Sequence, residues 1–223
     1  MRNLTSLFLL FNLIMLYSAK EELPKNGVLG IDVSEWDGRI DWAKVKNAGI
    51  QYAILRGTVK DESTDPTFEY NYKGAIENGI DVSVYKFSYA LTVEKAEQDL
   101  DNLMLLLNGR VMPVYIDLEW DKQGELGKDA VTEIAVAWVK KCQSYGYECG
   151  VYSNTNWYKN YYYPERLQEL GCKFWIAQYG KNTGEYDEKY KPNVGEYIWQ
   201  YTSRGKVDGI PEASDGVDMN MMY

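Results

Sequence analysis

The chain has 223 residues and a formal net charge of −9, which allows one sizeable core and disfavours binding to nucleic acid or anionic membranes. Histidine is absent, so mechanisms that need an imidazole are excluded. No cysteine spacing is typical of a metal site. We therefore expect no metal and no cofactor, and acid–base chemistry falls to carboxylates, Tyr, Lys and Cys.

The N-terminal residues have the order of a secretory signal peptide. One positive charge is followed by an almost wholly apolar stretch at residues 4–17, and the small residues Ser18 and Ala19 precede a charged run. We expect residues 1–26 to be a signal peptide with a short leader, and the protein to be secreted. The apolar stretch is short for a membrane span, and an uncleaved anchor is the alternative. Residues 27–223 are expected to form a single domain.

Beyond this segment, apolar runs alternate with helical patterns. The helices are predicted at residues 65–79, with Asp65 as N-cap and Pro66 at the first helical position, and at residues 92–107 and 128–145. Strands that alternate with helices indicate a parallel sheet, and about eight in one domain indicate an irregular, TIM-like (β/α) barrel with fewer helices near the C-terminus. An open doubly wound sheet is the alternative. Buried strands are predicted at residues 28–33, 52–56, 82–87, 114–119, 148–153, 174–178, 197–201 and 216–219.

Three cysteines leave an odd thiol if one disulfide forms. Cys149 and Cys172 would each open a strand, and neighbouring strand starts can bring two thiols within bridging distance. Cys142 with Cys149 is the other credible pair, so the pairing stays open.

The strand at residues 114–119 ends in two carboxylates. Asp117 and Glu119 point the same way because strand side chains alternate, and they lie roughly 7 Å apart along the chain. A lone pair of this kind is more often a helix cap beside a solvated acid. In a parallel barrel, however, reactive groups collect at the C-terminal strand ends, where Asp32 and Asp218 are also expected. Four acids around one pocket are costly, which favours a catalytic role.

Aromatic and polar residues occur at the same strand ends. The chain has 20 Tyr and 7 Trp, more than a core of this size needs, although each ring taken alone is better explained by packing. Aromatic faces stack on sugar rings, and the acids without imidazole or metal favour glycoside hydrolysis over acyl or phosphoryl transfer. The candidate substrate-binding residues are Tyr85, Lys86, Phe87, Tyr152, Gln178, Tyr179 and Trp199.

A family resemblance adds to this prediction. The segment at residues 32–38 (DVSEWDG), followed by IDW at residues 40–42, resembles the opening motif of glycoside hydrolase family 25, the lysozymes of the Chalaropsis type. The resemblance covers about residues 28–223. Further segments follow in the family's order at residues 53–56, 65–71, 84–90, 113–119, 150–154, 175–179, 199–201 and 217–220.

The resemblance implies an irregular barrel that cleaves the β-1,4 bond between N-acetylmuramic acid and N-acetylglucosamine in bacterial peptidoglycan. By position, Glu119 matches the family's general acid and Asp117 its partner, while Asp32 and Asp218 match two further acids of the pocket. Tyr85 matches a tyrosine that lines it. Asp117 could steady the charge on the sugar, orient a substrate acetamido group or position water.

One departure concerns Lys86, because family members often carry His at that position. It could contact the substrate or pair with Asp32 or Asp117. We expect a monomer without a stable membrane partner. The alternative functions are a chitinase or another N-acetylhexosaminidase, and a secreted glycan-binding protein without turnover.

Overall fold

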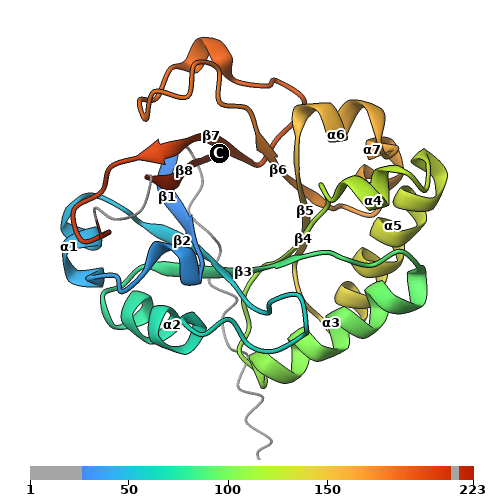
Figure 1. Ribbon diagram of the computed structural model, residues 1–223, viewed down its shortest axis with the longest axis horizontal. Helices are drawn as coiled ribbons and strands as arrows, with labels where there is room; N and C mark the ends of the chain where they lie inside the picture. The colour runs from blue at the N-terminus through green and yellow to red at the C-terminus, as the bar shows by residue number, and fades with distance from the viewer. Residues whose placement is uncertain (1–26, 212–215) are drawn as a thin grey trace, which may run out of the picture.

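The protein is a closed eight-stranded barrel with helices on its outside (Figure 1). The computed structural model describes residues 27–211 and 216–223, so the predicted signal peptide lies outside the described residues. Closure confirms the predicted barrel and rules out the open sheet. The strands are β1 (Val28–Val33), β2 (Tyr52–Arg56), β3 (Asp81–Phe87), β4 (Val114–Asp117), β5 (Cys149–Asn154), β6 (Lys173–Ala177), β7 (Ile198–Gly205) and β8 (Val217–Met222).

The last strand runs against the others. Successive strands from β1 to β7 pair in parallel, whereas β8 is antiparallel to both β7 and β1 and closes the barrel between them. Consequently Asp218 lies near the start of its strand, not at the C-terminal end that the sequence predicted. It still reaches the same rim as the ends of the parallel strands because β8 points the other way.

Long helices cover only the first half of the barrel. In α3 the apolar residues at helical spacing are all fully buried, namely Ala96, Leu100, Leu103 and Leu107. No helix longer than three residues follows β6 in the described part of the chain, as the crowded last strands predicted. The helices are α1 (Trp42–Asn47), α2 (Phe68–Glu77), α3 (Val93–Leu107), α4 (Asp121–Gly124), α5 (Lys128–Ser144), α6 (Thr155–Asn160) and α7 (Pro164–Gln168), with 3-10 turns η1 (Glu35–Asp37) and η2 (Glu188–Tyr190).

The start of α2 differs from the prediction. The helix begins at Phe68, and Thr67, not Asp65, occupies its N-cap position. The Asp65 carboxylate instead accepts hydrogen bonds from Thr67 and from the Arg56 guanidinium. Asp65 therefore lies in the loop before α2 and links this loop to Arg56 at the end of β2.

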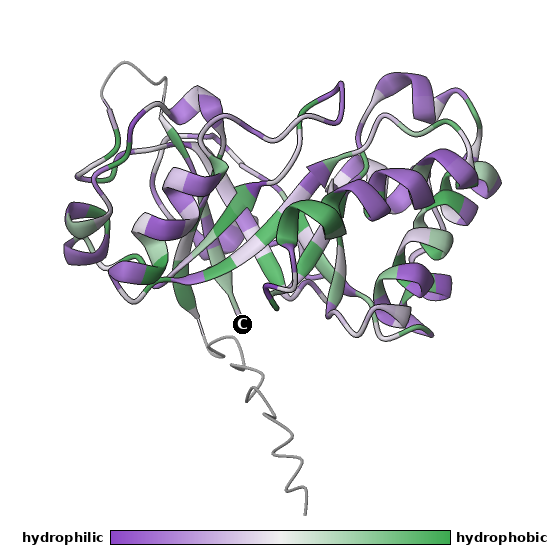
Figure 2. Ribbon diagram, turned by 90° about the horizontal axis from the view of Figure 1, so that it is seen from below, coloured by the Kyte–Doolittle hydropathy of each residue, from purple (hydrophilic) through white to green (hydrophobic). Residues whose placement is uncertain are grey.

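Buried apolar side chains form two clusters, a large one between the strands and the helices and a smaller one inside the barrel. Figure 2 shows that hydrophobic residues occur along the strands, whereas the helices carry both hydrophilic and hydrophobic residues. The inner cluster contains Tyr52, Tyr115 and Trp175, which are all buried. Gly30 and Gly150 give these rings room, because a Cβ at either glycine would overlap Tyr52 or Tyr115 respectively. Large rings thus fill the inside of the barrel, and polar groups line the end where strands β1 to β7 finish.

Among the described residues, none of the helices has the length and apolarity needed to cross a membrane.

The three cysteines are buried neighbours with free thiols. Neither predicted disulfide is present: the Cys142 and Cys149 thiols are hydrogen-bonded, and this bond together with burial raises the pKa of Cys142. Burial is also the main cause that raises the pKa of Cys172, with Cys149 close by. The sequence prediction that strand starts bring these thiols together is therefore met without a covalent bond.

Candidate active site

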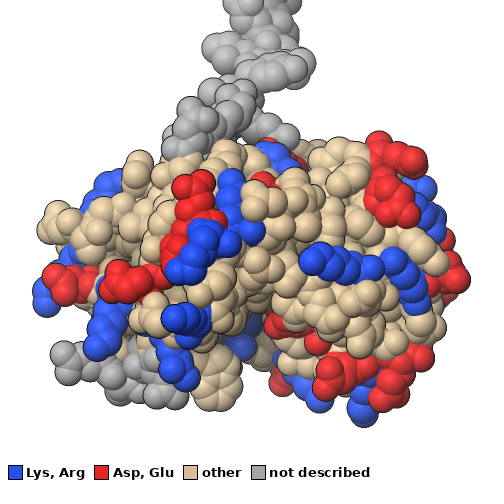
Figure 3. Space-filling view, turned by 90° about the horizontal axis from the view of Figure 1, so that it is seen from above, with Lys and Arg blue, Asp and Glu red and all other residues tan. Residues whose placement is uncertain are grey.

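Four carboxyl groups meet at the end of the barrel where the parallel strands β1 to β7 finish. In the antiparallel pairing of β1 and β8, Asp32 lies directly opposite Asp218. Asp117 ends β4 on the opposite wall, and Glu119 follows two residues later. The charges of Glu119, Asp32 and Asp218 all add to burial in raising the pKa of Asp117, so the four groups lie within one electrostatic cluster. Figure 3 shows a notch in the lower edge of the molecule, at this end of the barrel.

Asp32 and Asp218 form a hydrogen-bonded carboxyl pair. Burial is the main cause that raises the pKa of Asp32 to about 7 and that of Asp218 to about 9. The charge of Asp37 adds to the rise in both pKa values, and the charge of Asp32 adds to that of Asp218. Because Asp218 has the higher pKa, it holds the proton and donates it to Asp32. At pH 7 the pair therefore carries about half a negative charge in place of two.

Two side-chain amides fix the position of Asp32. Its Oδ2 atom accepts hydrogen bonds from Gln200 Nε2 at 2.8 Å and Asn220 Nδ2 at 2.7 Å. The orientation of both amides is set, because Gln200 Oε1 accepts from the Tyr152 hydroxyl and Asn220 Oδ1 accepts from Trp175 Nε1, each at 2.8 Å. These bonds lower the pKa of Asp32 and oppose the effect of its burial.

The second carboxyl pair has fewer partners. Asp117 is 4% exposed, and its Oδ1 atom is buried without a hydrogen-bond partner among the described residues. Burial, followed by the charge of Glu119, raises the pKa of Asp117 well above its usual range. Glu119 is partly buried, and burial raises its pKa, opposed by Asn154 Nδ2, which donates to Oε2 at 3.4 Å. This pair can hold and release a proton beside an open hydrogen-bonding position.

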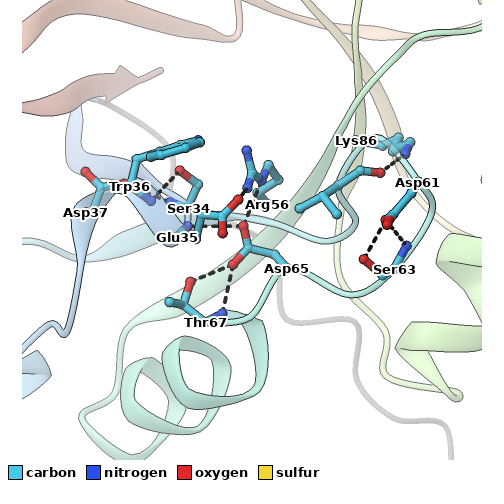
Figure 4. Close-up of polar contacts among 11 residues, drawn as sticks. Ser34, Glu35, Trp36, Asp37, Arg56, Asp61, Ser63, Asp65, Thr67 and Lys86 are labelled. Atoms are coloured by element: carbon cyan, nitrogen blue, oxygen red, sulfur yellow. Dashed lines mark hydrogen bonds and ion pairs between the residues drawn. The ribbon is translucent and has the colours of Figure 1, made fainter.

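An arginine joins the two loops that border the site (Figure 4). Arg56 ends β2, and its Nη2 and Nε atoms bind Glu35 Oε1 at 2.5 Å and Asp65 Oδ2 at 2.7 Å. Glu35 lies in η1, directly after β1, and the capping box of Ser34 and Asp37 holds this turn. The clamp therefore fixes the chain that leaves the β1 end, next to Asp32.

Four of the seven predicted substrate-binding residues face the inside of the barrel. Tyr85 packs edge-on against Trp175 at 5.8 Å between ring centroids, and burial with the charges of Asp32 and Asp117 raises its pKa. Phe87 is aligned with Asp117 in the pairing of β3 and β4. Tyr152 and Tyr179 both donate to Gln200 Oε1. These four side chains lie close enough to the acids to shape a pocket around them.

The other three predicted substrate-binding residues point away from the acids. Lys86 is fully buried outside the barrel, where its Nζ atom binds the Val59 carbonyl at 2.9 Å (Figure 4). It also binds Glu62 at 3.1 Å, so the suggested pairing with Asp32 or Asp117 is wrong. Trp199 Nε1 donates to the Gln178 carbonyl, and the Gln178 amide donates to the backbone. The reason is strand alternation, which sends each of these side chains to the opposite face from its inward neighbour.

Sequence reasoning missed the polar groups that support the acids. Gln200, Asn220, Asn154 and Arg56 were not among the predicted site residues. The alternation of side chains along a strand was the available signal. Gln200 and Trp199 are neighbours on β7, so only one of them, Gln200, points into the pocket. Asn220 lies two residues after Asp218 on β8 and therefore points to the same face.

Comparison with known proteins agrees with this geometry. A family model described as Glycosyl hydrolases family 25 matches residues 31–210. Lysozyme M1 of Streptomyces globisporus is 25% identical over 206 residues, which cover 87% of this chain and 67% of that protein.

Two solved structures show the same fold. The modular autolysin LytC of Streptococcus pneumoniae, in complex with a synthetic peptidoglycan ligand, has a TM-score of 0.70 and 27% identity, and the match covers 89% of this chain and 47% of that chain. The bacterial lysozyme of Streptomyces coelicolor has a TM-score of 0.67 and 22% identity, and the match covers 90% of this chain and 94% of that chain. Since the family model spans most of the sequence and the barrel agrees, this chain belongs to glycosyl hydrolase family 25.

Proposed function

We propose that this protein is a muramidase that hydrolyses the β-1,4 bond between N-acetylmuramic acid and N-acetylglucosamine in peptidoglycan. The observation that carries the proposal is the cluster of Asp32, Asp117, Glu119 and Asp218 at the end of a family 25 barrel. The similarity to lysozyme M1 and to LytC, which was solved with a peptidoglycan ligand, supports this substrate.

In this proposal Glu119 is the general acid. Its raised pKa keeps a proton available, and it is more exposed than Asp117, so it can reach a glycosidic oxygen. The proton moves to that oxygen as the bond to the sugar C1 breaks and positive charge builds on the ring. The net negative charge of the four-acid cluster stabilises that positive charge.

Asp117 orients the acetamido group of the substrate. Its buried Oδ1 atom lacks a partner among the described residues, so it is free to accept the acetamido N–H. The acetamido oxygen then attacks C1 while the leaving group departs, and water opens the resulting ring with Glu119 acting as base. This route belongs to the substrate-assisted exceptions to the two-carboxylate scheme.

The test is release of reducing ends from purified peptidoglycan by the wild type and by Glu119→Gln. We expect the variant to fold normally and to lose at least about 100-fold in rate, because it cannot donate a proton. Glu125→Gln is the matched control: it makes the same change at an exposed residue of the next turn and should keep full activity. Wild-type activity in Glu119→Gln would remove Glu119 from the acid role.

Chitin is the second substrate in the same assay. Cleavage of chitin without cleavage of peptidoglycan would assign the protein to the N-acetylhexosaminidases. Binding of either polymer without any new reducing ends would assign it to the glycan-binding proteins.

We also propose that the protein acts outside the cell, because the order of charges and apolar residues at its N-terminus is typical of a secreted protein. N-terminal sequencing of protein from the culture medium tests this. A start near residue 19 or 20 supports cleavage, and retention of residue 1 in the membrane fraction contradicts it.

A further inference from the structure

A line of three aromatic rings leads away from Asp117 along the rim. Phe87 is aligned with Asp117, and its ring centroid lies 4.8 Å from that of Tyr89. Tyr89 packs edge-on against Trp120 at 5.3 Å. Trp120 directly follows Glu119 and is partly exposed. The proposed acid pocket therefore continues into an aromatic surface on the β3 and β4 side.

Two lysines converge on the end of this line. The Nζ atoms of Lys60, in the loop after β2, and Lys122, in α4, lie 5.9 Å and 5.5 Å from the centre of the Trp120 ring. Lys60 is also 5.2 Å from the Tyr89 ring. Both lysines are exposed. Two like charges on one ring repel each other unless an anion lies between them.

Nearby carboxylates do not neutralise these lysines. Asp61, next to Lys60, accepts hydrogen bonds from Ser63. Glu62 binds Lys86 and Lys95. Within the described residues, neither Lys60 nor Lys122 takes part in an ion pair. Two ammonium groups without an ion pair among the described residues therefore lie beside an aromatic surface at the rim of a protein whose net charge is −9.

We infer that Phe87, Tyr89, Trp120, Lys60 and Lys122 form a subsite for the peptide stem of peptidoglycan, with a stem carboxylate between the two ammonium groups. The inference rests on the proposed function. The stem is attached to the muramic acid whose bond is cleaved, so it must leave the pocket close to Glu119. The rings contact the apolar parts of the stem, and the lysines attract its charge.

The subsite predicts a preference for substrates with charged stems. Its contacts are remote from the reacting atoms and form on binding, so their loss raises KM and leaves kcat almost unchanged. Chitin and stripped glycan strands lack the stem and gain nothing from the lysines. The preference weakens with added salt, because exposed charges are screened.

The experiment uses the full chain and three preparations of one peptidoglycan, freed of wall phosphate polymers: intact, with its stem carboxylates amidated, and with its stems removed by an amidase. KM and kcat are measured for the wild type, Lys60→Gln, Lys122→Gln and the double variant. Lys140→Gln, an exposed lysine of α5, is the matched control. Circular dichroism checks that each variant is folded.

We expect the double variant to raise KM about fivefold on the intact substrate and to match the wild type on the other two. Equal KM values for wild type and double variant on intact peptidoglycan would overturn the inference while leaving the proposed function in place. A lysine effect that persists after amidation of the stem carboxylates would also overturn it. Wild-type inactivity on all three preparations would instead reject the proposed function.

Discussion

The two walls of the acid cluster are built differently. On the β1 and β8 wall, Asp32 is held by two amides whose own orientations are fixed by tyrosine and tryptophan donors. On the β4 wall, Asp117 has an oxygen without a partner in the described part of the chain, and Glu119 accepts a long hydrogen bond of 3.4 Å.

The difference separates two tasks. Asp218 Oδ1 on the first wall is also buried without a hydrogen-bond partner among the described residues. The two amide donors keep the Asp32 carboxylate in place, whereas the free positions of Asp117 and Glu119 can exchange protons and receive a substrate group. Substitutions on one wall at a time can separate these tasks.

The largest effect is expected on the β4 wall. Asp117→Asn should reduce kcat on peptidoglycan about 100-fold or more, because the amide can present a donor where the acetamido N–H needs an acceptor. Thermal unfolding should show no loss of stability, since a buried carboxyl group with an unpartnered oxygen is replaced by a neutral group of the same shape.

Asp121→Asn makes the same change at an exposed residue of α4 and is the control. Retention of more than a tenth of the wild-type kcat by Asp117→Asn would contradict the role given to Asp117.

A substitution on the β1 and β8 wall should change how the free energy of unfolding depends on pH. Folding raises the pKa of Asp32 and Asp218 to about 7 and about 9 from 3.8, so the folded state binds more protons and loses stability as the pH rises from about 4 to about 9. Asp218→Asn removes most of this loss and should increase the free energy of unfolding at pH 8 on the order of 2 kcal/mol.

Urea unfolding of the wild type and Asp218→Asn between pH 5 and pH 9 measures this effect. Asp208→Asn, at an exposed aspartate, should follow the wild-type curve. Parallel curves for the wild type and Asp218→Asn would show that the pair does not take up a proton on folding.

A smaller effect is expected from Asn154, which donates a hydrogen bond to Glu119. Asn154→Ser keeps an N-cap oxygen for α6 and removes the amide that lowers the pKa of Glu119. The pH at which activity falls on the alkaline side should therefore move upward, by less than about one unit. Asn154→Asp keeps the cap and adds a fifth carboxylate, so the pH at which activity falls on the alkaline side should move upward further. If that pH is unchanged in both variants, the contact with Asn154 does not influence the pKa of Glu119.

Much of the fold could be predicted from the sequence, because buried strands and capped helices have strong local signals. The predicted bounds of β1 and β2 are those of the structure, and Thr92 and Asn108 bound α3 as expected. The reversal of β8 has no local signal: an apolar strand looks the same in either direction, and only pairing with β1 and β7 sets it.

The site was predicted in part for a similar reason. Carboxylates at strand ends stand out in a sequence because burying them is costly. Glu119 lies two residues beyond the end of β4, so strand alternation alone does not set its direction, although its charge raises the pKa of Asp117. Gln200 and Asn220 do not stand out, since an amide near a strand end is common. Lys86 was misplaced because its role depends on Glu62, in a loop whose path the sequence pattern does not define.

The most direct test of the account replaces the leaving group. A 2,4-dinitrophenyl β-glycoside of the peptidoglycan disaccharide needs no proton at its leaving oxygen, so general acid catalysis contributes little to its cleavage. Glu119→Gln should hydrolyse this substrate within about tenfold of the wild-type rate while failing on peptidoglycan, and Asp117→Asn should fail on both. Equal losses on both substrates in Glu119→Gln would contradict the assignment of Glu119 as proton donor.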